Sequence, residues 1–225
     1  LQNILDECGQ DETIRSILIT GAGKAFCAGQ DLKEAIDPES LEIEEIVCQH
    51  FNPIIRKIRG IEKPVIAAVN GVAAGAGANI ALSCDIVLAA KSANFIQAFS
   101  KIGLIPDSGG TYFLPRLIGL PKATAIMMTG ETISAEQAES MGMIYSVYED
   151  TEFEDSALKL AQTIAAMPTK GLGYTKKLLS QSFNNSLEDQ LSLEAKTQAL
   201  SAGTEDHQEG IQAFLDKRSP RFTGK

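Results

Sequence analysis

Short apolar runs alternate with helix-like stretches along the first two thirds of the chain. The runs at 16–20, 65–69 and 86–89 have the length and composition of buried strands. The stretches at 1–11 and 44–59 repeat their apolar residues at helical spacing. Because strands that alternate with helices form parallel sheets, this pattern predicts an α/β domain with a parallel sheet.

The last third of the chain has a helical pattern only. We therefore expect two parts, a core over 1–150 and a helical region over 151–225. Ser134, Ser186 and Thr204 stand directly before helix-like stretches and are suited to the N-cap position, where a hydroxyl can accept a backbone N–H.

Two glycine-rich turns each follow a predicted strand. The run at 65–69 leads into the turn at 70–79, and the run at 16–20 leads into the turn at 21–32. The first N–H groups of a helix have no internal partner, and glycine lets a ligand approach them. Two such turns can direct two N–H groups at one oxygen, which is an oxyanion hole. The alternative is that the small residues only let a helix pack closely on a sheet.

Composition narrows the function further. The 225 residues carry a net charge of −9, which argues against a nucleic-acid surface. No apolar run approaches the length of a transmembrane helix, and the four cysteines show no metal or disulfide spacing. The two histidines, His50 and His207, are far apart in sequence. We expect a cytoplasmic protein with no metal site and no nucleic-acid partner.

The two turns carry a family resemblance. The segment 25–32, Ala-Phe-Cys-Ala-Gly-Gln-Asp-Leu, resembles the first oxyanion segment of the crotonase or enoyl-CoA hydratase/isomerase family, and 71–79 resembles the second. The resemblance implies a crotonase-like ββα spiral with a C-terminal helical trimerisation region. It also implies an acyl-CoA substrate, with coenzyme A as part of that substrate and no separate cofactor. A homotrimer or hexamer is implied, and the family's N-terminal strands are missing from this chain.

The same resemblance assigns roles to individual residues. The backbone N–H groups of Gln30 and Ala76 are expected to hold the thioester oxygen. Lys217, Arg218 or Arg221 either reaches a phosphate of coenzyme A or belongs to a solvated tail. The residues expected to contact substrate are Ala28, Asp31, Leu32, Gly75, Asn79 and Phe99.

Asp107 is the candidate catalytic residue. Hydratases of the family place glutamates at the positions that here hold Asn79 and Phe99, so hydration by two carboxylates is not expected. Asp107, in the segment 105–111, matches the proton-shuttling carboxylate of isomerases in the family. The 1,2-epoxyphenylacetyl-CoA isomerase and Δ3,Δ2-enoyl-CoA isomerase branches resemble this chain most. We expect burial among the apolar residues at 104–106, with Phe99 and Phe113 closing the pocket, to raise the pKa of Asp107, which suits a group that takes and returns a proton.

Other interpretations remain. Asp107 alone also suits a residue that caps a helix beginning near Ser108. Asn79 can donate to substrate or simply pack, and Phe99 is suited to a wall of the acyl pocket. At the level of function, the alternatives to an isomerase are an enoyl-CoA hydratase and a non-catalytic acyl-CoA-binding scaffold.

Overall fold

Two sheets form the centre of the molecule, rather than the single sheet that the sequence pattern predicts. The computed structural model describes residues 1–31 and 41–225. In this part of the chain, four parallel strands form the first sheet, in the order β1 (Ile17–Thr20), β3 (Val65–Val69), β5 (Ile86–Ala90) and β8 (Ser146–Tyr148). The second sheet has the order β2 (Ala25–Cys27), β4 (Val72–Ala74), β6 (Asn94–Ile96) and β7 (Thr132–Ser134), and only its β6–β7 pair is antiparallel.

The chain passes from the first sheet to the second inside the glycine-rich turns. Each turn contains a strand of only three residues, β2 or β4, and these two strands pair in parallel. A three-residue strand is too short to show alternation in sequence, which is why the second sheet was missed. At the entrance to β4, a Cβ added to Gly71 would lie 2.2 Å from the carbonyl oxygen of Lys24. Glycine therefore allows the two turns to approach each other.

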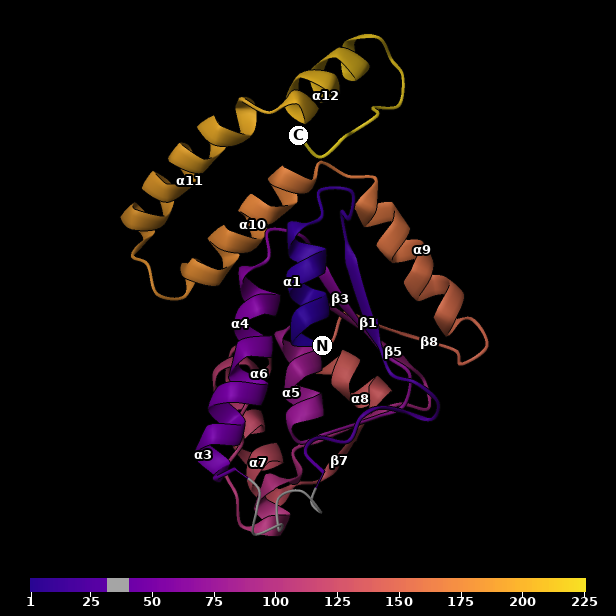
Figure 1. The fold of residues 1–225 in the computed structure, drawn as a ribbon, viewed down its shortest axis with the longest axis vertical. Helices are drawn as coiled ribbons and strands as arrows, with labels where there is room; N and C mark the ends of the chain where they lie inside the picture. Colours follow the sequence, from indigo (N-terminus) through magenta and orange to yellow (C-terminus); the bar gives the residue numbers. More distant parts are fainter. Residues whose placement is uncertain (32–40) are drawn as a thin grey trace.

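Helices surround the two sheets (Figure 1). Their bounds are α1 (Gln2–Gln10), α3 (Ile43–Ile46), the π-helix η1 (Val47–Phe51), α4 (Asn52–Gly60), α5 (Ala76–Ser83), the 3₁₀-helix η2 (Ala98–Ile102), α6 (Gly110–Ile118), α7 (Leu120–Thr129), α8 (Ala135–Ser140), α9 (Phe153–Ala165), α10 (Thr169–Ser182), α11 (Leu187–Ala202) and α12 (Glu205–Leu215). In the described part of the chain, no helix has the combination of length and apolar character that crossing a membrane requires.

Helix α5 lies at the centre of the fold, and every one of its residues is buried. It packs against β3, β4, α4 and α6. Its second residue, Gly77, lies directly against the first turn: an added Cβ would be 2.1 Å from the carbonyl oxygen of Cys27. The small residues at the start of α5 therefore let the helix contact the main chain of the neighbouring turn.

The helix predicted over 44–59 has a wider turn in its middle. The N–H of Asn52 donates to the carbonyl oxygen of Val47, five residues earlier, in the π-helical turn η1. Pro53 then lies in the first turn of α4, where its missing N–H is tolerated. The helix is thus irregular just before Pro53, and the irregularity takes the form of a π turn.

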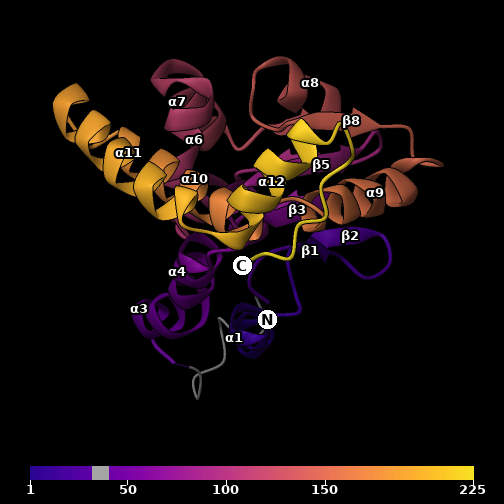
Figure 2. The same ribbon diagram turned by 90° about the horizontal axis from the view of Figure 1, so that it is seen from above.

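The C-terminal helices divide into two groups. Helix α9 packs on β1, β3, β5 and β8, whereas α11 packs along α10 and α12 contacts α11, to one side of the sheets (Figures 1 and 2). The hydroxyl groups of Ser134, Ser186 and Thr204 each accept a backbone N–H at the start of α8, α11 and α12, so the predicted N-caps are confirmed.

A buried lysine joins α10 to the core. The ammonium group of Lys176 lies 2.8 Å from a carboxylate oxygen of Asp85, just beyond the end of α5. It also donates to the carbonyl oxygens of Ile58 at 2.6 Å and Lys63 at 3.1 Å. Asp85 has a second cationic partner, Arg59, at 2.9 Å. Burial is the largest influence on Lys176 and holds its pKa below the usual range, with the nearby Asp85 acting in the opposite direction.

Candidate active site

The two glycine turns meet at the start of α5. Gly29 has a φ of +94°, and an added Cβ would lie 3.1 Å from the carbonyl oxygen of Ala74 and 3.6 Å from the nitrogen of Ala76. The first turn therefore lies against the residues that begin α5. Gly75 is the N-cap of this helix, with a φ of +53° that a side chain rarely tolerates.

Two N–H groups are available where these turns meet. Ala76 is the first residue of α5, so its N–H has no helical partner and lies at the positive end of the helix dipole. In the described part of the chain, neither this N–H nor that of Gln30 donates to another protein group. Their joint action on one oxygen stays a prediction, and the contact of Gly29 with Ala76 supports it.

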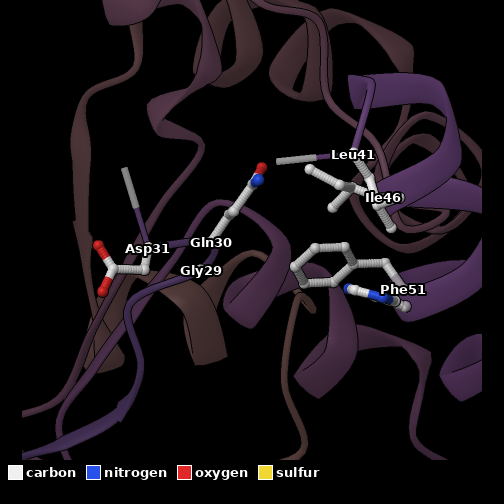
Figure 3. Close-up of a pocket in the computed structure, with 7 residues that line it drawn as sticks. Gly29, Gln30, Asp31, Leu41, Ile46 and Phe51 are labelled. Atoms are coloured by element: carbon white, nitrogen blue, oxygen red, sulfur yellow. The ribbon is translucent and has the colours of Figure 1, made fainter. Parts of the chain in front are cut away.

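A pocket of about 210 Å³ opens beside the first turn. Among the described residues, one side is formed by 29–31 and the other by Leu41, Ile46, His50 and Phe51. In Figure 3 the side chain of Gln30 extends toward Leu41 and Ile46, whereas the carboxylate of Asp31 points away from Phe51.

The π turn brings His50 and Phe51 to this pocket. π-helical turns are rare and are frequent at functional sites. Sequence reasoning missed His50 because neither histidine belongs to a recognisable motif. The sequence feature nearest to this turn is Pro53, which disfavours a regular helix ahead of it.

Asp107 lies in the loop between η2 and α6 and is half-buried. Its carboxylate oxygen Oδ1 accepts a hydrogen bond of 2.8 Å from the hydroxyl of Ser108. In the described part of the chain, Oδ2 has no protein donor. Burial raises the pKa of Asp107, and the hydrogen bond from Ser108 opposes that rise. The predicted direction of this pKa shift is confirmed.

The predicted cause of the burial is wrong for two of the residues named. Leu104 is 41% exposed and Ile105 is 79% exposed, so these two side chains do not enclose Asp107, whereas Phe99 is buried. On the other side of the loop, Ser108 is 1% exposed, and an added Cβ on Gly109 would lie 2.7 Å from the ring of Phe113. The loop is therefore packed most tightly at the residues that follow Asp107, just before α6 begins.

The carboxylate of Asp107 does not cap α6. That helix begins at Gly110 with Gly109 as its N-cap, and no side chain accepts its first N–H groups. Asp107 contributes only its main-chain oxygen, which accepts the N–H of Gly110 at 2.8 Å. Helix capping therefore does not explain this carboxylate.

Asn79 is the fourth residue of α5, and Phe99 lies close to Gly75, the N-cap of the same helix. Asn79 is completely buried: its Nδ2 donates to the main-chain oxygen of Asp107, and its Oδ1 accepts from Gln97, each at 2.8 Å. Phe99 is 6% exposed, and an added Cβ on Gly75 would lie 3.7 Å from its ring. Contact of either residue with substrate stays a prediction.

The remaining predicted residues lie beside the first turn, near the C-terminus or outside the described part of the chain. Ala28 and Asp31 are exposed beside the first turn, while Leu32 lies outside the described residues. Arg218 pairs with Glu209 at 2.6 Å. Arg218 thus already has an acidic partner in the same chain, and its role toward a phosphate of coenzyme A stays a prediction. In the described part of the chain, no group of three His, Cys, Asp or Glu side chains could hold a metal ion.

Comparison with known proteins identifies the family of the chain. The chain matches the family described as enoyl-CoA hydratase/isomerase over residues 1–225. It belongs to this family of enzymes, which is also called the crotonase family, and the predicted α/β crotonase-like fold is confirmed.

Named relatives include both reaction types. The chain is 48% identical to the 1,2-epoxyphenylacetyl-CoA isomerase of Escherichia coli strain K12, covering 100% of this chain and 87% of that protein. It is 44% identical to a Rhodobacter capsulatus protein named "Probable enoyl-CoA hydratase", covering 94% of this chain and 82% of that one. A crystal structure of enoyl-CoA hydratase from Bacillus anthracis has a TM-score of 0.91 and 35% identity, covering 100% of this chain and 87% of that one.

Proposed function

We propose that this protein is an acyl-CoA isomerase in which Asp107 moves a proton on a thioester enolate. The observation that carries the proposal is the state of the Asp107 carboxylate. It is half-buried, one oxygen is fixed by Ser108, and the other has no protein donor in the described part of the chain. A carboxylate with one oxygen fixed and one open is suited to proton transfer, and its raised pKa brings it closer to the pKa of its reaction partner.

The reaction begins with the thioester oxygen bound by the N–H groups of Gln30 and Ala76. Asp107 Oδ2 takes a proton from the carbon next to the thioester carbonyl. The electrons of that C–H bond pass to the carbonyl oxygen as an enolate, which the two N–H donors stabilise. The same carboxyl group returns the proton to a different carbon of the acyl group. No atom is gained or lost, so the overall reaction is an isomerisation that needs no cofactor besides the coenzyme A of the substrate.

The 48% identity to the Escherichia coli enzyme supports 1,2-epoxyphenylacetyl-CoA as the substrate, with a Δ3-enoyl-CoA as the second candidate. Hydration of an enoyl-CoA is the alternative reaction, and the hydratase names among relatives favour it. Two features speak for isomerisation. Asn79 cannot act as an acid or a base, and Phe99 lacks an ionisable group.

Assembly and location complete the proposal. We propose a homotrimer or hexamer formed through the C-terminal helices, because α11 and α12 expose large apolar side chains, including Leu187 at 71% and Phe214 at 84%. We propose a cytoplasmic location, supported by four cysteines that are all free thiols. Binding of nucleic acid is not proposed, since the net charge is −9.

The test is turnover of a panel of acyl-CoA thioesters by the wild type and by Asp107→Asn. The panel contains 1,2-epoxyphenylacetyl-CoA, a Δ3-enoyl-CoA and a Δ2-enoyl-CoA, and the assay separates isomerised from hydrated products. Asp107→Asn keeps the shape but removes the base, so isomerisation should fall by roughly two to four orders of magnitude. Because a base must be deprotonated, wild-type kcat/KM should rise as the pH rises through the raised pKa of Asp107.

The matched control is Asp155→Asn, which removes an exposed carboxylate on α9 and should leave turnover unchanged. Full isomerase activity in Asp107→Asn would refute the proposed mechanism. Fast hydration by the wild type, without isomerisation, would establish the alternative reaction. A wild type that binds these thioesters and turns over none of them would indicate a non-catalytic scaffold.

A further inference from the structure

Asn79 connects the start of α5 to the loop that carries Asp107. Asn79 is 0% exposed, and its side chain bridges between two partners. Its Nδ2 donates to the main-chain oxygen of Asp107 at 2.8 Å. Its Oδ1 accepts from Nε2 of Gln97, also at 2.8 Å, and Gln97 is 1% exposed.

The direction of these hydrogen bonds is fixed by chemistry. The main-chain oxygen of Asp107 can only accept, so the amide of Asn79 must present its NH₂ group there. The carbonyl oxygen of Asn79 then faces Gln97, which must present its own NH₂ group. This leaves Gln97 Oε1 as a buried acceptor with no protein donor in the described part of the chain. The two amides therefore adopt a single arrangement that holds the loop from one side.

The loop needs such support because its backbone is strained. Ser108 has a φ of +50°, although it is not a glycine, and Gly109 follows with a φ of +76°. Strained residues of this kind persist only where the surroundings fix them. The peptide of Asp107 is fixed by two bonds to its oxygen, one from Gly110 N–H and one from Asn79. An added Cβ on Gly110 would lie 2.4 Å from Asn79 Nδ2, so the asparagine is in close contact with the loop.

We propose that Asn79, held by Gln97, is a positioning residue that sets the place of the Asp107 carboxylate relative to the N–H donor of Ala76; this inference rests on the proposed function. Ala76 and Asn79 are the first and fourth residues of α5, so one helical turn carries both groups. The rigid turn thereby fixes the separation between the donor that stabilises the enolate and the base that forms it. In this role Asn79 acts through the main chain of Asp107.

The test uses Asn79→Asp, which keeps the shape of the side chain and its acceptor toward Gln97. An ionised carboxylate cannot donate to the oxygen of Asp107, so the loop loses its support. Since misplacement of a catalytic group by about 1 Å can cost a hundredfold, kcat should fall by about tenfold to a hundredfold. KM should change little, because the N–H donors that bind the thioester remain.

The pH dependence distinguishes positioning from a general loss of structure. A protonated carboxyl at position 79 can donate again to the oxygen of Asp107. The ratio of the kcat of Asn79→Asp to that of the wild type should therefore rise as the pH falls. The matched control is Asn185→Asp, which removes a hydrogen bond from Asn185 to Gln190, far in sequence from Asn79 and Asp107. Its ratio of variant to wild-type kcat should stay close to one at every pH.

A second variant covers the case in which Asn79→Asp does not fold. Gln97→Met removes the donor that orients Asn79 but leaves the bond to Asp107 possible, so kcat should fall severalfold at unchanged KM. If both folded variants keep the wild-type kcat while Asp107→Asn is inactive, the positioning role is refuted and the proposed function stands. If Asp107→Asn is fully active, the proposed function fails and the positioning role fails with it.

Discussion

Helix α5 and the C-terminal helices α10–α12 are held in place by different means. All eight residues of α5 are buried, and its N-terminus is an N-cap glycine with no side-chain cap. By contrast, α11 has 16 residues, of which only Thr197 is buried, and it begins at a serine cap. Helix α5 is therefore enclosed by its neighbours, whereas α11 has a side-chain cap and buries little of itself within the chain. Packing gives α5 the stability that a side-chain cap would otherwise give. The first N–H groups of this helix can therefore remain without a protein partner and be available to a ligand.

Replacing a glycine by alanine should change the stability of the protein in opposite directions in α5 and in α10. Gly77→Ala in α5 places a Cβ where the carbonyl oxygen of Cys27 already lies, at 2.1 Å. Overpacking of this kind costs about 1–3 kcal/mol and sometimes more, so we expect a loss of at least about 3 kcal/mol in the free energy of unfolding. Urea unfolding at one fixed protein concentration measures it.

The matched control is Gly171→Ala in α10. Its added Cβ would meet only Ser201 Oγ at 3.8 Å and Pro168 at 4.0 Å, which is ordinary contact. Alanine is the better helix former, so this variant should gain about 0.5–1 kcal/mol. If the two variants changed stability by the same amount and sign, the contrast between the buried helix and the C-terminal helices would be wrong.

The exposed apolar residues of the C-terminal helices test the proposed assembly. Phe214 in α12 is 84% exposed, so its replacement removes little packing within the chain. Phe214→Ser should shift the mass measured by light scattering from that of an oligomer toward that of a monomer. The far-UV circular dichroism should stay the same. An unchanged oligomer mass would mean that Phe214 lies outside the interface.

The smallest effect is expected at a helix cap. The hydroxyl of Ser186 accepts the N–H of Asp189 at 3.1 Å at the start of α11. Ser186→Ala should lower the free energy of unfolding by about 1 kcal/mol, the typical value of such a cap. Thermal unfolding with Ser180→Ala as the control provides the comparison, because the Ser180 hydroxyl bonds only within α10. A drop in stability equal to that of the control would show that the cap at α11 adds nothing.

The same contrast explains which features were predictable from the sequence. The caps at Ser134, Ser186 and Thr204 were predictable because each depends on a hydroxyl and on residues within three positions of it. The glycine turns were also visible in sequence. Strands β2 and β4 inside those turns were not, because they form only when two turns distant in sequence pair with each other.

The candidate site also has some features that could be predicted from the sequence and others that could not. Asp107 was found from its segment, yet the exposure of Ile105 and the bond from Asn79 to the Asp107 main chain depend on how α5 and α6 pack. The π turn that brings His50 to the pocket was likewise not predicted from the sequence. Contacts between segments far apart in the chain have no local signal in either one.

The buried ammonium of Lys176 has a consequence for the way in which α10 attaches to the core. Its three oxygen partners come from Ile58, Lys63 and Asp85, three separate places in the chain. A helix held only by apolar side chains can slide or detach by degrees, with a small penalty at each step. A half-detached α10 would leave an ammonium out of water and short of partners, which is costly at every intermediate position. We therefore expect α10 to attach to the core in an all-or-none manner rather than by degrees.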